Sequence, residues 1–203
     1  MHQDETITGI DTMHVVLTYR NYDYGWNLPE DKGGSLFSEP ETQAIRDFVL
    51  EHDFVYAVSF HSGVDLILYP WSHTEAPPPD NAKFVEISQG LSRVTGGTLY
   101  LQCSELYIAY GTWDDWMYGV AGVFALTCEI YGDTTVGAPQ TAYSRYPYSE
   151  MIDDPRTGYL SNSRSQIIYN PHTGMIEDVI RRWLPVFFYI TNTAIAEAYE
   201  AVD

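Results

Sequence analysis

Apolar residues form one continuous run beyond the middle of the chain, at Val123–Cys128, in a stretch bounded by Gly122 and Gly132. A short apolar run of this kind is typical of a β-strand that is buried on both faces. Such a strand belongs in the middle of a sheet covered by helices. The residue that follows the run, Glu129, is expected to lie at the edge of that sheet, where open α/β folds have their active sites. The alternative interpretation is that Glu129 only ends the strand in water.

Shorter apolar runs predict the neighbouring strands. They lie at Met13–Thr18, Phe54–Phe60, Leu66–Tyr69 and Thr98–Leu101. The second and third of these runs are separated by His61-Ser62-Gly63. A histidine is therefore expected at the end of a buried strand.

Two stretches have the apolar spacing of helices in the first half of the chain. The first begins at Ser38, which can cap it, carries Pro40 in its first turn and runs to about His52. Three apolar residues of this helix are expected on one face: Ile45, Phe48 and Val49. The second helix is predicted over Asn81–Val94 and ends before Gly96.

The C-terminal part contains the longest helical stretch, Met175–Ala201. Six of its apolar residues are spaced for one face: Ile176, Val179, Ile180, Trp183, Leu184 and Phe187. Pro185 is expected to kink or split this helix. A helical turn is predicted at Asp114–Gly119, and a long polar segment rich in turn residues covers Asp133–Asn170.

Composition narrows the class of protein. The 203 residues are enough for one domain with a sizeable core. The formal net charge is −18, so the chain should repel nucleic acid and anionic membranes rather than bind them. No apolar run reaches transmembrane length, and no signal peptide is visible in the polar stretch Met1–Asp11.

The two cysteines, Cys103 and Cys128, do not form a C-x-x-C pair, so a cysteine-based zinc site is not expected. Buried free thiols are the expected state, with a disulfide between the two as the alternative. A histidine offers other chemistry, because the neutral ring of His61 could bind zinc while a carboxylate such as Glu129 serves as a general base on water. The alternative for His61 is a structural, hydrogen-bonded histidine.

Five short segments of the chain contain motifs that are informative when they are taken together in order. They are RNYDYGW from Arg20, SEPE from Ser38, SFHSGVDLILYPW from Ser59, Tyr107 with the following GTWDDWMYG, and TCEI from Thr127. In this order and spacing they resemble the zinc carboxypeptidases of the carboxypeptidase A and B type. The resemblance implies an α/β fold with a mixed, mostly parallel sheet flanked by helices. It also implies zinc-dependent removal of the C-terminal residue, with peptide or protein C-termini as the partner.

The resemblance assigns roles to five residues of this chain. His61 matches a zinc ligand. Glu129 matches the catalytic glutamate, which takes a proton from the attacking water and passes it to the leaving amine. Arg20 matches an arginine that grips the substrate's terminal carboxylate, and Tyr107 matches a mobile tyrosine that closes over the substrate. Asp114 falls at the floor of the pocket for the terminal side chain, where an acid would favour lysine or arginine. The alternative is that the neighbouring Trp113 and Tyr110 hold apolar side chains.

The match is less complete at the N-terminal side. The family's first two zinc ligands come from an H-x-x-E motif well before the arginine, and here only His2-x-x-Glu5 fits that pattern by letter. The expectation is therefore one catalytic domain over residues 1–203 that is the C-terminal part of a longer enzyme. The alternatives are a module that binds peptide C-termini without hydrolysis and an inactive fragment. The resemblance implies an extracellular location, and a cytoplasmic one is the alternative.

Overall fold

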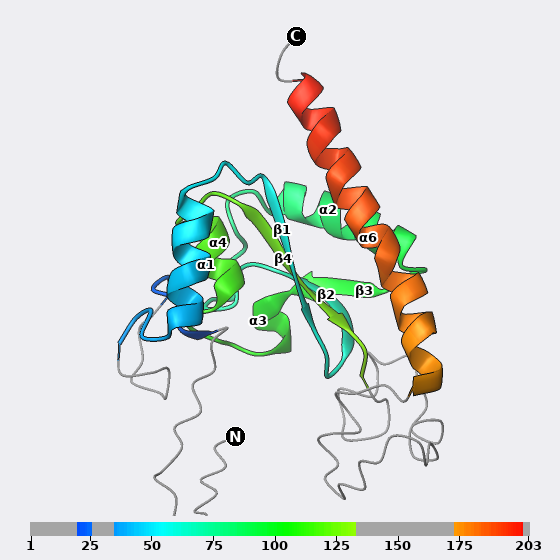
Figure 1. Cartoon of the computed structure of the whole chain (residues 1–203), viewed down its shortest axis with the longest axis horizontal. Helices are drawn as coiled ribbons and strands as arrows, with labels where there is room; N and C mark the ends of the chain where they lie inside the picture. The colour runs from blue at the N-terminus through cyan, green and yellow to red at the C-terminus, as the bar shows by residue number, and fades with distance from the viewer. Residues whose placement is uncertain (1–19, 26–34, 133–172, 201–203) are drawn as a thin grey trace, which may run out of the picture.

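The computed structural model describes residues 20–25, 35–132 and 173–200 (Figure 1). The predicted strand at Met13–Thr18, the pair His2 and Glu5, and the segment Asp133–Asn170 lie outside these residues. The described elements follow one another in this order: α1 (Pro40–Leu50), β1 (Tyr56–His61), β2 (Asp65–Tyr69), α2 (Asn81–Val94), β3 (Leu99–Gln102), α3 (Cys103–Leu106), α4 (Trp113–Gly119), β4 (Phe124–Ile130) and α6 (Thr173–Glu200).

The described strands form one sheet in the order β1-β4-β2-β3. β1 runs parallel to β4, β2 runs parallel to β3, and β2 is antiparallel to β4. The sheet is therefore mixed and mostly parallel, as predicted. The apolar run that contains Ala125, Leu126 and Cys128 is the interior strand β4, and these three side chains are fully buried.

Strand alternation sends the residues of β4 to two different faces. Leu126 and Cys128 belong to the larger hydrophobic cluster, whereas Ala125 belongs to a second cluster on the opposite face. Glu129 follows Ala125 by four residues and so shares its face. The parallel register pairs Glu129 with His61 on β1. Two neighbouring strands therefore deliver a carboxylate and an imidazole to the same place.

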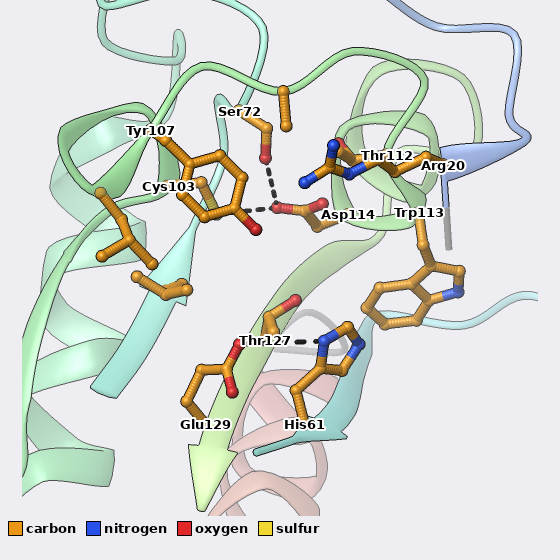
Figure 2. Close-up of a pocket in the computed structure, with 13 residues that line it drawn as sticks. Arg20, His61, Ser72, Cys103, Tyr107, Thr112, Trp113, Asp114, Thr127 and Glu129 are labelled. Atoms are coloured by element: carbon orange, nitrogen blue, oxygen red, sulfur yellow. Dashed lines mark hydrogen bonds and ion pairs between the residues drawn. The ribbon is translucent and has the colours of Figure 1, made fainter. Parts of the chain in front are cut away.

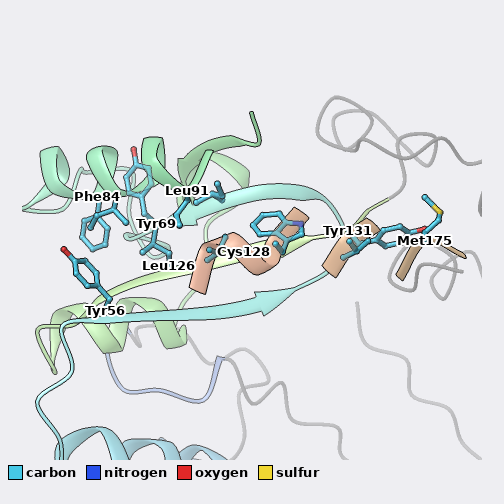
Figure 3. Packing of buried hydrophobic residues seen from close by; sticks show 13 residues of the cluster. Tyr56, Tyr69, Phe84, Leu91, Leu126, Cys128, Tyr131 and Met175 are labelled. Carbon is cyan, nitrogen blue, oxygen red and sulfur yellow. The ribbon is translucent and has the colours of Figure 1, made fainter. Parts of the chain in front are cut away.

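Helices cover both faces of this sheet (Figure 1). α2 and α6 pack over one face, where Phe84 and Leu91 of α2 meet Leu126 of β4 in the larger cluster (Figure 3). α4 packs on β4 from the other face, with Trp116 and Met117 in the second cluster. Glu129, which shares the face of Ala125, therefore lies on the face of the sheet that carries α4.

The start of α1 differs from the prediction. Its N-cap is Glu39, not Ser38, and Glu39 makes no side-chain capping hydrogen bond. The side chain of Asn21, which is fully buried, serves this helix end instead: its Oδ1 accepts hydrogen bonds from the Glu39 backbone N–H and from Thr42 Oγ1. Of the three apolar residues expected on one face of α1, only Val49 is buried, since Ile45 and Phe48 are exposed.

The face of α6 also differs from the prediction. The helix continues through Pro185 as one element rather than being split there. Its buried residues are Met175, Val179, Trp183 and Val186. Four of the six residues predicted to share a face are exposed: Ile176, Ile180, Leu184 and Phe187. The helix is apolar over more than one face, and its contact with α2 and the sheet selects a narrow stripe of it. No helix within the described residues has the length and apolar character needed to cross a bilayer.

Both cysteines are free and buried, as expected, so they are not paired with each other. Burial raises the pKa of the Cys128 thiol and raises that of Cys103 well above its usual value. Protonated, enclosed thiols react slowly. We therefore expect both thiols to resist Ellman's reagent in the folded chain at pH 8 and to react at once in 6 M guanidinium. Immediate reaction of a thiol in the folded chain would contradict this placement.

Candidate active site

A pocket of about 480 Å³, including the part open to solvent, lies on the α4 face of the sheet (Figure 2). All five residues that were assigned roles from the sequence line it: Arg20, His61, Tyr107, Asp114 and Glu129. They come from the segment at residues 20–25, from β1, from the loop after α3, from α4 and from β4. The fold thus brings together residues that are widely separated in the chain.

His61 and Glu129 face each other at one side of the pocket (Figure 2). His61 Nδ1 lies 3.8 Å from Glu129 Oε1. The other carboxylate oxygen of Glu129, Oε2, is buried and accepts no hydrogen bond from the described residues. A buried carboxylate oxygen that the described residues leave unsatisfied is costly unless a ligand or water completes it. This side of the pocket is therefore suited to receive a polar group.

Burial changes the protonation of this pair in opposite directions. It lowers the pKa of His61, against a smaller opposing effect of the negative charge of Asp114. It raises the pKa of Glu129 to about 7. The contact between them is thus not an ion pair of two full charges at neutral pH. Glu129 can both accept and donate a proton in this range, which is what general acid–base chemistry needs.

Arg20 and Tyr107 form another side of the pocket. The Arg20 guanidinium carbon lies 5.3 Å from the centre of the Tyr107 ring. The backbone that follows Arg20 is anchored, because the side chain of Asn21 is bound at the start of α1 and the Tyr22 backbone N–H donates to the Gly111 carbonyl at 3.0 Å. Tyr107, by contrast, is about half exposed. A cation on an anchored stretch of backbone thus lies beside an accessible aromatic ring.

Asp114 lies in the first turn of α4 and is 5% exposed. Two side chains donate hydrogen bonds to its Oδ2: Ser72 Oγ at 3.1 Å and Cys103 Sγ at 2.9 Å. Both donors also line the pocket. The buried end of the pocket therefore carries one carboxylate held by two donors.

The neighbouring residue, Asp115, is fully buried and anchors the segment that contains Ser72. Its carboxylate accepts hydrogen bonds from the backbone N–H groups of Ser72 and His73, at 2.8 and 3.0 Å, and from His73 Nδ1 at 2.6 Å. Burial raises the pKa of Asp115, against the lowering effect of the His73 hydrogen bond. The Ser72 carbonyl in turn accepts from the Ala109 N–H at 3.0 Å, so Asp115 indirectly supports the loop that carries Tyr107.

Sequence reasoning did not single out three of these residues: Ser72, Cys103 and Asp115. Asp115 stands next to Asp114 in the acidic pair between Trp113 and Trp116, and that doubled acid was the available signal. The other two act through contacts with Asp114, from which Ser72 is separated by 42 positions. No local sequence pattern predicts a contact between residues that are so far apart in the chain.

His61 and Glu129 carry the kinds of group that zinc sites use. An imidazole nitrogen beside a carboxylate, with one carboxylate oxygen unsatisfied by the described residues, suits zinc chemistry. A catalytic zinc ion usually has three protein ligands. Within the described residues, no group of three or more histidine, cysteine, aspartate or glutamate side chains is arranged to hold a metal ion. His61 is therefore one candidate ligand rather than a complete site.

Comparison with known proteins agrees with the fold and with the motifs. The sequence profile described as zinc carboxypeptidase matches residues 4–160. Carboxypeptidase B of Bos taurus is 29% identical over 128 residues, which cover 55% of this chain and 31% of that protein. Carboxypeptidase A1 of Rattus norvegicus is 34% identical over 102 residues, which cover 46% of this chain and 24% of that protein. The chain thus spans about a quarter to a third of the length of these relatives.

A solved structure supports the same architecture. Carboxypeptidase A from Helicoverpa armigera superposes with a TM-score of 0.64 and 18% sequence identity, over 91% of this chain and 43% of that one. At this identity the likeness concerns the fold. The family profile, however, covers well over half of the residues. This chain belongs to the zinc carboxypeptidase family.

Proposed function

We propose that this chain carries the substrate pocket and the acid–base residue of a zinc-dependent carboxypeptidase, which releases the C-terminal residue of a peptide by hydrolysis. One observation supports this most directly. A cation, an aromatic ring and a buried acid line the same pocket as the facing pair His61 and Glu129. A peptide end has three matching parts: a terminal carboxylate, a terminal side chain and a scissile bond.

In this proposal Arg20 binds the terminal carboxylate. Its planar guanidinium can donate two parallel hydrogen bonds to one carboxylate, which fixes the direction of the peptide as well as its charge. Tyr107 lies beside the guanidinium and is about half exposed, so it is placed to cover a bound peptide end. Asp114 receives the terminal side chain, and its negative charge in a buried place favours lysine or arginine there.

Glu129 moves the protons of the reaction. The oxygen of a water molecule bonds to the scissile carbonyl carbon, the bond from that carbon to nitrogen breaks, and the products are a new carboxylate and a free amine. The carboxylate of Glu129 takes a proton from the water and gives it to the departing nitrogen, and the second proton of the water also passes to that nitrogen, so the amine leaves as an ammonium group. Bound zinc supplies Lewis-acid polarisation of the reacting oxygens. His61 provides one ligand in this proposal, which requires further ligands from outside the described residues.

A second function is favoured by the uneven composition of the site. The described residues supply a carboxylate-binding cation and an acid for the terminal side chain, but only part of a metal site. Such a chain would bind peptide C-termini without hydrolysing them. The two functions share the pocket and differ in whether a peptide is cut in the presence of zinc.

Calorimetry with short peptides tests the shared part. We expect a peptide that ends in a free carboxylate to bind, and its C-terminal amide to bind about 30-fold or more weakly, because the amide cannot pair with the charge of Arg20. Arg20→Ala should weaken binding of the free acid by a similar factor and remove the difference between the two peptides. Arg181→Ala, which removes an exposed arginine of α6, is the matched control and should change neither. Equal affinity for acid and amide would exclude the proposed role of Arg20.

A further inference from the structure

The two protein donors that hold Asp114 bind the same oxygen atom. Ser72 Oγ and Cys103 Sγ both donate to Oδ2, at 3.1 and 2.9 Å. A carboxylate oxygen has two lone pairs, so this oxygen is fully used by the protein. Both of these donors leave the other oxygen, Oδ1, to a ligand. Asp114 therefore offers a ligand one oxygen and not two.

The two hydrogen bonds to Asp114 Oδ2 join buried side chains, so they are less free to rearrange than contacts at the surface. Asp114 is 5% exposed, and Cys103 and Ser72 are 8% and 3% exposed. Because its pKa is raised well above the usual value, the Cys103 thiol stays protonated at neutral pH and remains a donor. Ser72 is fixed by Asp115, which accepts its backbone N–H at 2.8 Å. Both donors are thus kept on Oδ2.

The number of carboxylate oxygens that Asp114 can offer affects the binding of lysine and arginine side chains differently. A guanidinium pairs best with a carboxylate through two parallel N–H donors that meet two oxygens. A single-oxygen acceptor leaves one of these donors without its partner in a buried place, which is costly. An ammonium group is a compact charge with three rotatable donors, and it can point one of them at a single oxygen.

We propose that Cys103 and Ser72 turn Asp114 into a one-oxygen acceptor, so that the pocket selects peptides ending in lysine over peptides ending in arginine. The inference rests on the proposed function, because it takes the pocket to hold the terminal side chain of a peptide. It names the substrate more narrowly, and it makes Cys103 a specificity-determining residue although the thiol need not touch the substrate.

Calorimetry with three peptides that differ only in the last residue tests this. We expect the full chain to bind the lysine peptide about tenfold more tightly than the arginine peptide, which is the scale of one hydrogen bond to a charged group. Cys103→Ala removes one donor from Oδ2 and should bring the two affinities close together. Ser72→Ala should act in the same direction, so the test does not depend on one variant being folded. A leucine peptide should bind these variants and the original chain alike.

Cys128→Ala is the matched control, since it removes the other buried thiol, which lies in the cluster on the opposite face of the sheet. It should leave the ratio of lysine to arginine affinity unchanged. An original chain that binds arginine peptides as tightly as lysine peptides overturns the inference, and so does a ratio that neither pocket variant alters. In both cases carboxylate-dependent binding would still stand, and the proposed function with it. Absence of carboxylate-dependent binding for all three peptides would overturn both.

Discussion

Replacing Glu129 with glutamine is expected to slow zinc-dependent release of a C-terminal residue by about 10²- to 10⁴-fold, the usual contribution of a general acid–base group. Glutamine keeps the shape of the side chain but cannot take a proton from water. The effect should therefore fall on kcat, while peptide affinity, which we propose depends on Arg20 and Asp114, should change little. The two readouts separate loss of proton transfer from loss of the pocket.

The measurement is the rate of release of free lysine from a short peptide by the zinc-loaded chain, together with calorimetry on the same peptide. Glu51→Gln is the matched control, because Glu51 is an exposed glutamate at the end of α1. A Glu129→Gln variant with an unaltered rate would exclude Glu129 as the acid–base residue. Peptide binding with no release by the unmodified chain would favour the binding function over the hydrolytic one.

Replacing Arg182 with alanine is expected to lower the free energy of unfolding by about 3–5 kcal/mol, because it removes a buried cation that pairs with the buried carboxylate of Asp65. Arg182 NH2 lies 2.6 Å from Asp65 Oδ1, and the two side chains are 8% and 5% exposed. Arg182 also donates to the Thr95 carbonyl through Nε at 3.1 Å and to Thr98 Oγ1. These contacts join α6 to β2 and to the end of α2.

Urea unfolding of the single and double variants measures this effect. Arg182→Met combined with Asp65→Leu should recover most of the loss, since apolar replacement of a whole buried pair is often close to neutral. Arg181→Ala changes the neighbouring arginine, whose side chain is 76% exposed, and should stay within about 0.5 kcal/mol of the original chain. A loss below about 1 kcal/mol for Arg182→Ala would mean that the pair is not a major stabilising contact.

Much of the fold could be predicted because its signals are local. The continuous apolar run before Glu129 identifies β4 as an interior strand, and helical spacing up to Gly96 marks α2. The same is true of His61, which follows an apolar run and is the last residue of β1. In each case the period of apolar residues and the next glycine lie within a few positions, so tertiary contacts were not needed to recognise them.

The errors come from positions where distant contacts decide the outcome. Ser38 has the side chain of a capping residue, yet Asn21, from a separate segment, serves the start of α1. α6 is apolar on several sides, and only its packing against α2 and the sheet selects Val179 and Trp183 over Ile180 and Leu184. Helical periodicity states which residues share a side, but it does not state which side meets a partner.

The sequence by itself determined the chemistry that this chain has available, because motif order and residue type are properties of the chain. Only the tertiary structure decided how that chemistry is arranged. Parallel pairing of β1 and β4 puts His61 opposite Glu129, and the burial that follows changes the pKa values of both. Packing of α3 and the Ser72 segment against α4 decides which oxygen of Asp114 receives the protein's own hydrogen bonds. Distances and desolvation arise only when separate segments meet, so they could not be read from any one of them.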